Sequence, residues 1–169
     1  GFDTYTFLKQ YKPKSVFFQP SGIESKFTEK LIKKGDTKNI IIIANLVPKK
    51  NIELVIDIAK ICPNYNFQIV GKGSELNGWK IKSNDTKNVN FCGYTSPEEI
   101  ISMIDDSFAF LLTSFFEGTP TSILECCARG LPIVTSNVGG LKSIIKEKEN
   151  GFVIDSFDKF KFKKEKPTY

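Results

Sequence analysis

Two carboxylates eight positions apart are the residues best placed to do chemistry in this 169-residue chain. Glu117 follows an apolar run and lies in a loop, and Glu125 lies in the helical pattern that begins after Pro120. The helix N-terminus between them offers unpaired N–H groups and partial positive charge, which suits a phosphate group. Each acid could also accept hydrogen bonds from sugar hydroxyls. The spacing therefore indicates a site for a phosphorylated, hydroxyl-rich ligand.

A purely structural interpretation of the two acids is also open. Glu117 could simply favour a helix N-terminus, and Glu125 could lie on a solvated helix face. However, the neighbours of Glu125 between Ile123 and Ala128 are apolar or cysteine residues. An acid in that environment has few solvated neighbours, which favours the functional interpretation.

The composition excludes several other chemistries. The chain has no His, which excludes Ser-His-Asp triads, Cys-His pairs and His general bases. Its net charge is +5, but Arg129 is the only Arg, so the basicity is poor evidence for nucleic-acid binding. No apolar run approaches the roughly 20 residues of a membrane span. The four cysteines form no Cys-x-x-Cys pair and are typical of reduced, cytosolic thiols packed as small apolar residues (Cys62, Cys92, Cys126 and Cys127).

The chain alternates between strand and helix patterns. Strands are expected at residues 16–18, 39–46, 67–70, 89–92, 108–112, 131–135 and 151–154. Helices are expected after Asn51 as far as residue 62, from Ser74, from Ser96 through Ile104, at 121–128 and at 141–146. This alternation predicts an α/β fold, a Rossmann-like doubly wound parallel sheet with helices on both faces. Ligands of such folds bind in the loops at the carboxyl ends of the strands.

A dinucleotide site is the first alternative for those loops. Gly71-Lys72-Gly73 follows an expected strand, but the third Gly of a G-x-G-x-x-G motif falls on Leu76. The pair also lies in mid-domain, where two glycines after a strand usually form only a tight turn. A P-loop sequence is absent, so neither nucleotide motif is complete.

Taken together, the motifs resemble the C-terminal, donor-binding half of a GT-B glycosyltransferase of the retaining group 1, or family 4, type. The resemblance covers residues 15–155. It rests on the Glu117-x7-Glu125 spacing, on Gly130-Leu131-Pro132-Ile133-Val134 and on Gly139-Gly140. Residues 19–24 resemble the family's Pro-Asn-Gly-Val-Asp, with Ser21 and Glu24 as departures, and residues 43–50 resemble its Gly-Arg-Leu…Lys segment. The Gly71–Gly73 turn fits the family's Gly-x-Gly.

The resemblance assigns roles to these residues. It implies that Glu125 binds the ribose hydroxyls, that Glu117 contacts the donor sugar, and that Lys50 is the point charge for the leaving phosphates. Backbone N–H groups of Gly118, Thr119 and Thr121 are expected at the diphosphate, which Pro120 cannot contact in this way. The remaining substrate-binding residues implied are Asn45, Gly71, Gly73, Gly93, Tyr94, Gly139 and Gly140. Asn45 stands where the family has Arg, which removes a fixed charge, and Ser143 stands where Glu is common.

The resulting hypothesis is a donor domain that binds a nucleotide-diphosphate sugar and supports retaining transfer to an acceptor hydroxyl. The family's metal independence implies no metal and no cofactor beyond this co-substrate. A non-catalytic sugar-nucleotide-binding module is the main alternative, and a related phosphorolysis or epimerisation is a lesser one.

The domain organisation expected is a hinge or end of a preceding domain at 1–14, the donor domain at 15–156 and a basic tail at 157–169. An acceptor glycan or lipid-linked saccharide would bind mainly through an N-terminal domain outside this chain. The present chain alone is expected to be inactive. The location expected is the cytoplasm, with weak membrane contact of the tail as one option and a frayed terminus as the other.

Overall fold

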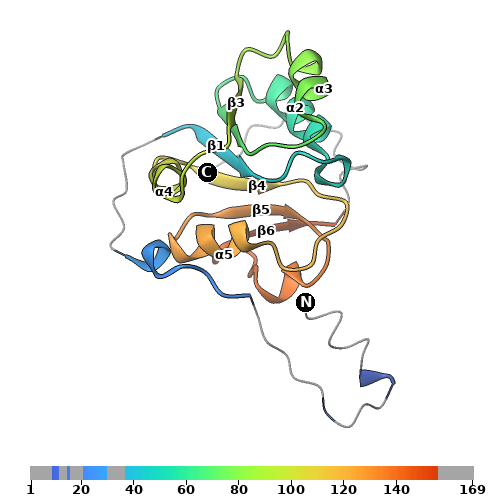
Figure 1. Ribbon diagram of the computed structural model, residues 1–169, viewed down its shortest axis with the longest axis vertical. Helices are drawn as coiled ribbons and strands as arrows, with labels where there is room; N and C mark the ends of the chain where they lie inside the picture. Colours follow the sequence, from blue (N-terminus) through green and yellow to red (C-terminus); the bar gives the residue numbers. More distant parts are fainter. Residues whose placement is uncertain (1–8, 12–14, 16–20, 30–36, 156–169) are drawn as a thin grey trace.

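The computed structural model describes residues 9–11, 15, 21–29 and 37–155, and six strands form one sheet within this part (Figure 1). The strands are β1 (Asn39–Ile43), β2 (Asn66–Val70), β3 (Val89–Gly93), β4 (Ala109–Leu112), β5 (Ile133–Ser136) and β6 (Gly151–Ile154). All neighbouring strands are parallel, and their order is β3-β2-β1-β4-β5-β6. This is the strand order of a doubly wound Rossmann-like sheet, so the predicted fold class is confirmed.

Helices cover both faces of the sheet. The α-helices are α2 (Ile52–Ile61), α3 (Leu76–Lys82), α4 (Pro97–Asp105) and α5 (Thr121–Ala128). Short 3-10 helices lie at η1 (Ser25–Thr28), η2 (Pro48–Lys50) and η3 (Leu141–Ser143). On β1, Ile41 belongs to the core with α4 and α5, whereas Ile42 belongs to the core with α2 and α3. Because successive strand residues point to opposite faces, the unbroken run of Ile in β1 is explained by this double coverage.

Local signals set several boundaries where they were expected. Ser96 caps α4 with a capping box: its side chain accepts from the N–H of Glu99 at 3.2 Å, and the Glu99 carboxylate accepts from the N–H of Ser96 at 2.9 Å. The helix α5 and the strand β6 have the predicted bounds. Cys126 is buried in the core, as predicted, and Cys62 and Cys127 are half-buried, but the prediction is wrong for Cys92, which is exposed on β3.

The predicted helix at 141–146 is wrong. Only the 3-10 helix η3 forms there, and the chain then turns toward β6. The side chain of Asn150 accepts from the N–H of Lys146 at 2.7 Å and donates to the carbonyl of Ile144 at 3.1 Å. These bonds satisfy backbone groups that a helix would otherwise pair, which is how Asn stabilises turns in competition with helices.

Other differences are smaller. β1 ends at Ile43 instead of residue 46, although the N–H groups of Ala44 and Leu46 still donate to the carbonyls of Val70 and Lys72. Asn51 precedes α2 as predicted, but with φ of 50° and no side-chain capping bond, and α3 begins at Leu76 and not at Ser74. The expected strand at 16–18 and the tail 157–169 lie outside the described residues. No helix in the described part of the chain is both long and apolar enough to cross a membrane.

Candidate functional site

The candidate site lies at the carboxyl ends of β1 and β4, the two central strands. The connections after these strands lead to opposite faces of the sheet, which is where doubly wound folds bind ligands. A pocket of about 290 Å³ opens there, and Lys50, Glu117 and Glu125 all line it. Four further residues expected at the site also line this pocket, namely Asn45, Gly71, Tyr94 and Thr121. The fold therefore brings together side chains from three separate parts of the sequence.

Lys50 and Glu117 form an ion pair inside this pocket. Lys50 Nζ donates to Glu117 Oε1 at 2.5 Å, and the two side chains are only 12% and 7% exposed. The pair joins η2, which follows β1, to the loop after β4. An ammonium group has three N–H donors, so Lys50 can bind a second anionic group while it holds Glu117.

Two serines that the sequence analysis did not single out position the Glu117 carboxylate through a series of hydrogen bonds. Ser114 Oγ donates to Glu117 Oε1 at 2.6 Å, and Ser136 Oγ at the end of β5 donates to the carbonyl of Ser114 at 2.6 Å. Both serines are buried. Lys50 and Ser114 thus share one carboxylate oxygen, and Glu117 Oε2 has no hydrogen-bond partner within the described residues.

Thr113 holds the backbone on the Lys50 side of the Lys50–Glu117 ion pair. Its hydroxyl is 3.0 Å from the carbonyl oxygens of Lys50 and Asn51, to which it donates, and it is buried at the end of β4. The N–H of Phe115 also donates to the carbonyl of Lys49 at 2.9 Å. The loops after β1 and β4 are therefore linked through their backbones as well as through the ion pair.

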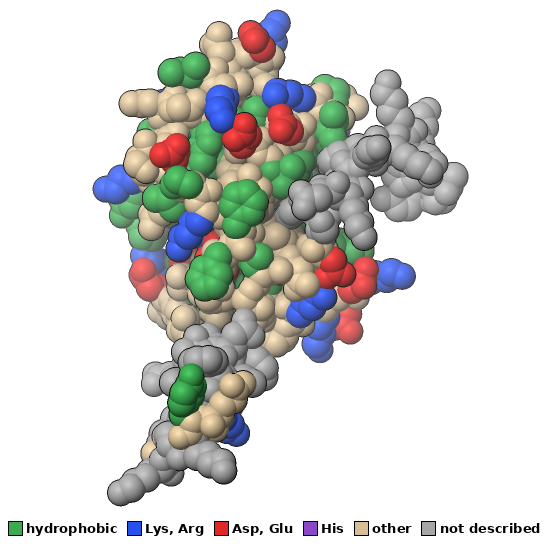
Figure 2. Space-filling view, turned by 90° about the vertical axis from the view of Figure 1, so that its right-hand side faces the viewer, with side chains coloured by type: hydrophobic (Ala, Val, Ile, Leu, Met, Phe, Trp, Pro, Cys, Tyr) green, Lys and Arg blue, Asp and Glu red, His purple; other side chains and the backbone are tan. Residues whose placement is uncertain are grey.

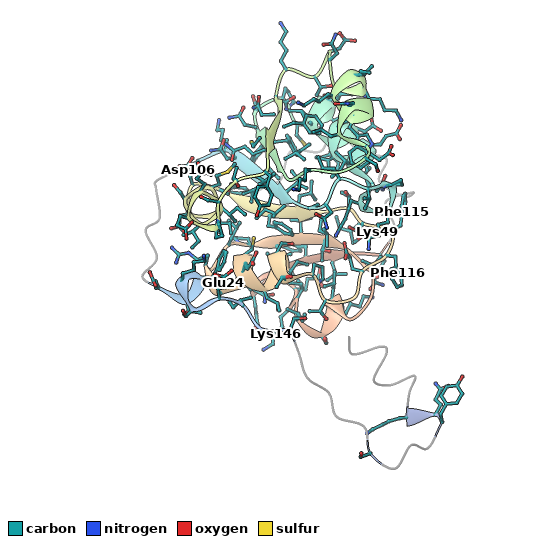
Figure 3. The ribbon with its side chains drawn as sticks, in the orientation of Figure 1. Glu24, Lys49, Asp106, Phe115, Phe116 and Lys146 are labelled. Carbon is teal, nitrogen blue, oxygen red and sulfur yellow. The ribbon has the colours of Figure 1, made fainter. Side chains whose placement is uncertain are left out.

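Glu125 lies on α5 and is half-buried, with its carboxylate lining the pocket. Burial raises the pKa of Glu125 above its usual value, and the charge of nearby Glu24 raises it further. Glu24 precedes η1 and lies beside α5 (Figure 3). The environment is one in which ionised Glu125 lacks full solvation, so a hydroxyl-bearing ligand could supply the missing hydrogen bonds.

The start of α5 faces the same pocket. Pro120 precedes the helix, has no side-chain cap, and is followed by Thr121 and Ser122, which also line the pocket. N–H groups in the first turn of a helix have no intrahelical acceptor, which leaves them available to an anion. Gly118 and Thr119 lie in the preceding loop but do not line the pocket.

Several glycines shape the surrounding loops without lining the pocket. Gly139 has φ of 57° and packs so tightly on the carbonyls of Glu117 and Gly118 that a Cβ would collide with them. Gly140 leads into η3, where Ser143 Oγ donates to its carbonyl at 2.6 Å. Gly73 packs against the backbone of Leu46, and Gly93 ends β3. Gly139 is therefore placed to support the Glu117 loop from outside the pocket.

The outer wall of the pocket combines polar and aromatic residues. Asn45 is exposed at its edge, and Tyr94 is exposed with Lys72 Nζ 4.9 Å from the centre of its ring. Thr95, which the sequence analysis missed, also lines the pocket, and its buried hydroxyl has no hydrogen-bond partner within the described residues. A buried polar atom of this kind needs a partner, which a bound ligand could provide.

The side of the molecule at the carboxyl ends of the strands, beside the pocket, carries exposed apolar side chains (Figure 2). Phe115 and Phe116 are among the most exposed aromatic residues, and they lie with Lys49 on this side (Figure 3). Lys49 thus faces solvent while Lys50, the lysine that the resemblance places at the phosphates, turns inward. Within the described residues, no three Asp, Glu or Cys side chains gather as metal ligands would.

A family model described as "Glycosyl transferases group 1" matches residues 23–165 of this sequence. The chain belongs to the group 1 glycosyltransferases. Among relatives of this group 1 chain, an Escherichia coli UDP-Gal:alpha-D-GlcNAc-diphosphoundecaprenol alpha-1,3-galactosyltransferase is 29% identical over 86% of the chain and 43% of its own length. An uncharacterized glycosyltransferase of Haemophilus influenzae is 32% identical over 72% of the chain and 36% of its own length. The chain thus spans less than half the length of either relative.

Solved structures share the fold of this group 1 chain. A mutant TarM of S. aureus, in complex with Fondaparinux, alpha-GlcNAc-glycerol and UDP, superposes with a TM-score of 0.71 at 24% identity. The match covers 90% of this chain and 32% of TarM. An Anabaena protein, Alr3699/HepE in complex with UDP and glucose, has a TM-score of 0.61 at 22% identity over 70% of this chain and 34% of that one. These likenesses establish the Rossmann-like fold of GT-B glycosyltransferases.

Proposed function

We propose that this domain binds a nucleotide-diphosphate sugar in the pocket between Lys50, Glu117 and Glu125 and supports transfer of the sugar to an acceptor hydroxyl. One observation carries the proposal: a lysine, two carboxylates and the start of α5 converge on one pocket at the switch point of the sheet. This combination offers positive charge for a diphosphate and acceptors for sugar hydroxyls, without a metal ion.

Each group has a part in the proposed reaction. In the transfer, the bond between the anomeric carbon and the diphosphate oxygen breaks, the acceptor oxygen bonds to that carbon, and the proton of the acceptor hydroxyl passes to the departing diphosphate oxygen. Negative charge then builds on the diphosphate, where Lys50 Nζ and the first N–H groups of α5 stabilise it. Glu117 Oε2, which has no protein partner in the described part of the chain, accepts from the donor sugar. Glu125 accepts from the ribose hydroxyls, and the stereochemistry proposed is retention.

The names of the relatives and the ligands of the solved structures support the proposed class of sugar donor and the proposed kind of product. The Escherichia coli relative is by its name a galactosyltransferase that uses UDP-Gal, and the Anabaena and S. aureus structures contain UDP. Other relatives are named for biosynthesis of O-antigen and amylovoran. By analogy, we propose a hexosyl donor and an acceptor glycan or lipid-linked saccharide, bound mainly by a second domain.

A non-catalytic sugar-nucleotide-binding module is the second candidate, and Asn45 is the observation that favours it. Asn45 lines the pocket at the position where the resemblance places Arg, so one charge expected at the diphosphate is missing. The two candidates share the ligand and differ in turnover. Product analysis with the donor and an acceptor saccharide, on the protein that contains the second domain, separates them.

A thermal-shift panel of nucleotide-sugars and nucleoside diphosphates tests the shared part of the proposal. The melting temperature should rise with one nucleotide class in the presence of EDTA, because a ligand that binds only the folded state stabilises it. Glu125→Ala should reduce the shift, whereas Glu149→Ala, at an exposed acid outside the pocket, should leave it unchanged. A panel with no shift at millimolar ligand would contradict the proposal.

A further inference from the structure

The charged side chains that line the candidate pocket do not make it strongly positive. Among the described residues they are Lys50, Glu117 and Glu125, which is one cation against two carboxylates. Asn45, at the position where the resemblance places Arg, adds no charge. Partial positive charge comes from the N–H groups at the start of α5, where Pro120 provides no side-chain cap. The pocket is therefore suited to an anion, but extra negative charge on the ligand meets no further cation.

Lys50 is also already paired. Its Nζ donates to Glu117 Oε1 at 2.5 Å, and the two side chains are only 12% and 7% exposed, so solvent screens the pair little. Ser114 is buried, and its Oγ donates to the same carboxylate oxygen at 2.6 Å, which holds the carboxylate against Lys50. An anion that binds the remaining N–H groups of Lys50 therefore lies close to a fixed negative charge. The attraction of Lys50 for that anion is partly cancelled by Glu117.

The donor and the product of the proposed transfer differ in charge at the phosphate that is bonded to the sugar. In the donor this phosphate is esterified on both sides and has one negative charge. After transfer it holds the proton of the acceptor hydroxyl, and it loses that proton to water near neutral pH because the second pKa of a terminal phosphate is about 6. A lysine alone would therefore bind the product more tightly than the donor and would slow product release.

We propose that Glu117 discriminates the intact donor from the nucleoside-diphosphate product. This inference rests on the proposed function, which places the diphosphate beside Lys50. Glu117 repels the second charge of the freed terminal phosphate, whereas the donor lacks that charge and offers a sugar hydroxyl to Glu117 Oε2. The carboxylate thus strengthens binding of the donor and weakens binding of the product, so that product does not block the site.

Methyl esters of nucleoside diphosphates separate the effect of charge from recognition of the sugar. When uridine, guanosine or adenosine diphosphate is esterified at its terminal phosphate, it keeps the single charge that the donor has there, but it carries no sugar. Calorimetry in EDTA at pH 8 compares each diphosphate with its ester. For the nucleotide that binds, the native chain should bind the two forms within about threefold of each other, because Glu117 offsets the preference of Lys50 for the added charge.

The Glu117→Gln variant should reveal that preference. It should bind the diphosphate at least about tenfold more tightly than the native chain does, whereas its affinity for the ester should change less than about threefold. Glu125→Gln removes the same charge from α5 instead of from the ion pair. This control should change the affinities for both ligands by the same factor. Circular dichroism shows whether each variant is folded.

The native chain supplies a second test that does not depend on the folding of a variant. Between pH 5 and pH 8 the terminal phosphate of the diphosphate loses its last proton, at a pKa of about 6, and the ester has no such proton. Protonation of Glu125, whose pKa is raised by burial, affects both ligands alike, so the ratio of the two affinities isolates the phosphate charge. This ratio should stay within about threefold over the whole range.

Two results would overturn the inference and leave the proposed function intact, since the diphosphate still binds in both. The first is a native chain that favours the diphosphate over the ester increasingly as pH rises. The second is a folded Glu117→Gln variant that binds both ligands more tightly by the same factor, or neither. If none of the three diphosphates binds the native chain, the proposed function is wrong and this inference fails with it.

Discussion

Lys50 and Glu117 are 67 positions apart in sequence, yet Lys50 Nζ and Glu117 Oε1 meet at 2.5 Å beneath the surface of the candidate site. The sheet order explains the meeting, because β1 and β4 are neighbours and their following loops leave from the same edge. The pair joins the two connections that form the pocket. We therefore expect it to support both the shape of the pocket and its charge.

Replacing one member of this ion pair should lower the free energy of unfolding more than replacing both members. Lys50→Met leaves Glu117 buried without its cation, so the free energy of unfolding should fall by about 3 kcal/mol. Lys50→Met combined with Glu117→Gln leaves no uncompensated charge and should be closer to native. Urea unfolding of the single and double variants measures this difference. Single variants no less stable than the double would show that the pair is not coupled in solution.

Ser114 should position Glu117 without contacting the ligand. Ser114→Ala removes the second hydrogen bond to Glu117 Oε1, so the carboxylate can rotate between two orientations. We expect nucleoside-diphosphate affinity to change less than twofold and nucleotide-sugar affinity to fall about fivefold, with Ser114→Thr restoring it. Calorimetry with the two ligands separates these effects. An equal loss for both ligands would indicate a general structural role.

Glu125 should make ligand affinity and stability depend on pH in opposite directions. Its pKa is raised by burial, so the ionised form is disfavoured in the folded protein. The destabilisation is present above the folded pKa and vanishes below the unfolded value of about 4.3. Glu125→Gln should therefore melt higher than native at pH 8 and equally at pH 3.5. Nucleotide affinity of the native chain should fall as pH drops through the raised pKa, and the Gln variant should lack that dependence.

Asn45 offers a gain-of-function test of the pocket. Asn45→Arg should tighten nucleoside-diphosphate binding by about 1 kcal/mol, roughly fivefold, because it adds a charge-assisted hydrogen bond. Binding should also become more sensitive to salt, since the new ionic contact is screened. Asn45→Gln is the matched control and should leave the affinity unchanged. Unaltered affinity in the Arg variant would show that this position does not face the diphosphate.

The sequence predicted most of the scaffold, since its signals are local. The Ile run of β1 and the Ser96–Glu99 capping box identify a doubly covered strand and a helix start without reference to distant residues. The Glu117–Glu125 spacing likewise depends only on one loop and the helix α5. In contrast, the helix expected at 141–146 failed, because the decisive contact is a side-chain bond from Asn150 to the backbone of Lys146.

The supporting residues of the site could not be found in the same way. Ser114 and Ser136 are ordinary serines in sequence, and their connection depends on β4 and β5 ending side by side. Thr95 is recognisable only from its buried, unpaired hydroxyl at the pocket wall. The motif already favours Lys50 over Lys49 for the site, but the bond to its backbone from Thr113, which lies 63 positions later, could not be predicted. Such residues emerge only when strand order and register are known.

Calorimetric titration of uridine, guanosine and adenosine diphosphates in EDTA tests the central claim most directly, with the native chain and the Lys50→Met/Glu117→Gln variant compared. That variant removes both charges together, so it keeps the charge balance of the buried pair. The account predicts that one diphosphate binds the native chain without metal and binds the variant at least tenfold more weakly, about 1.4 kcal/mol. Binding that disappears in EDTA, or equal affinity in the two proteins, would contradict it.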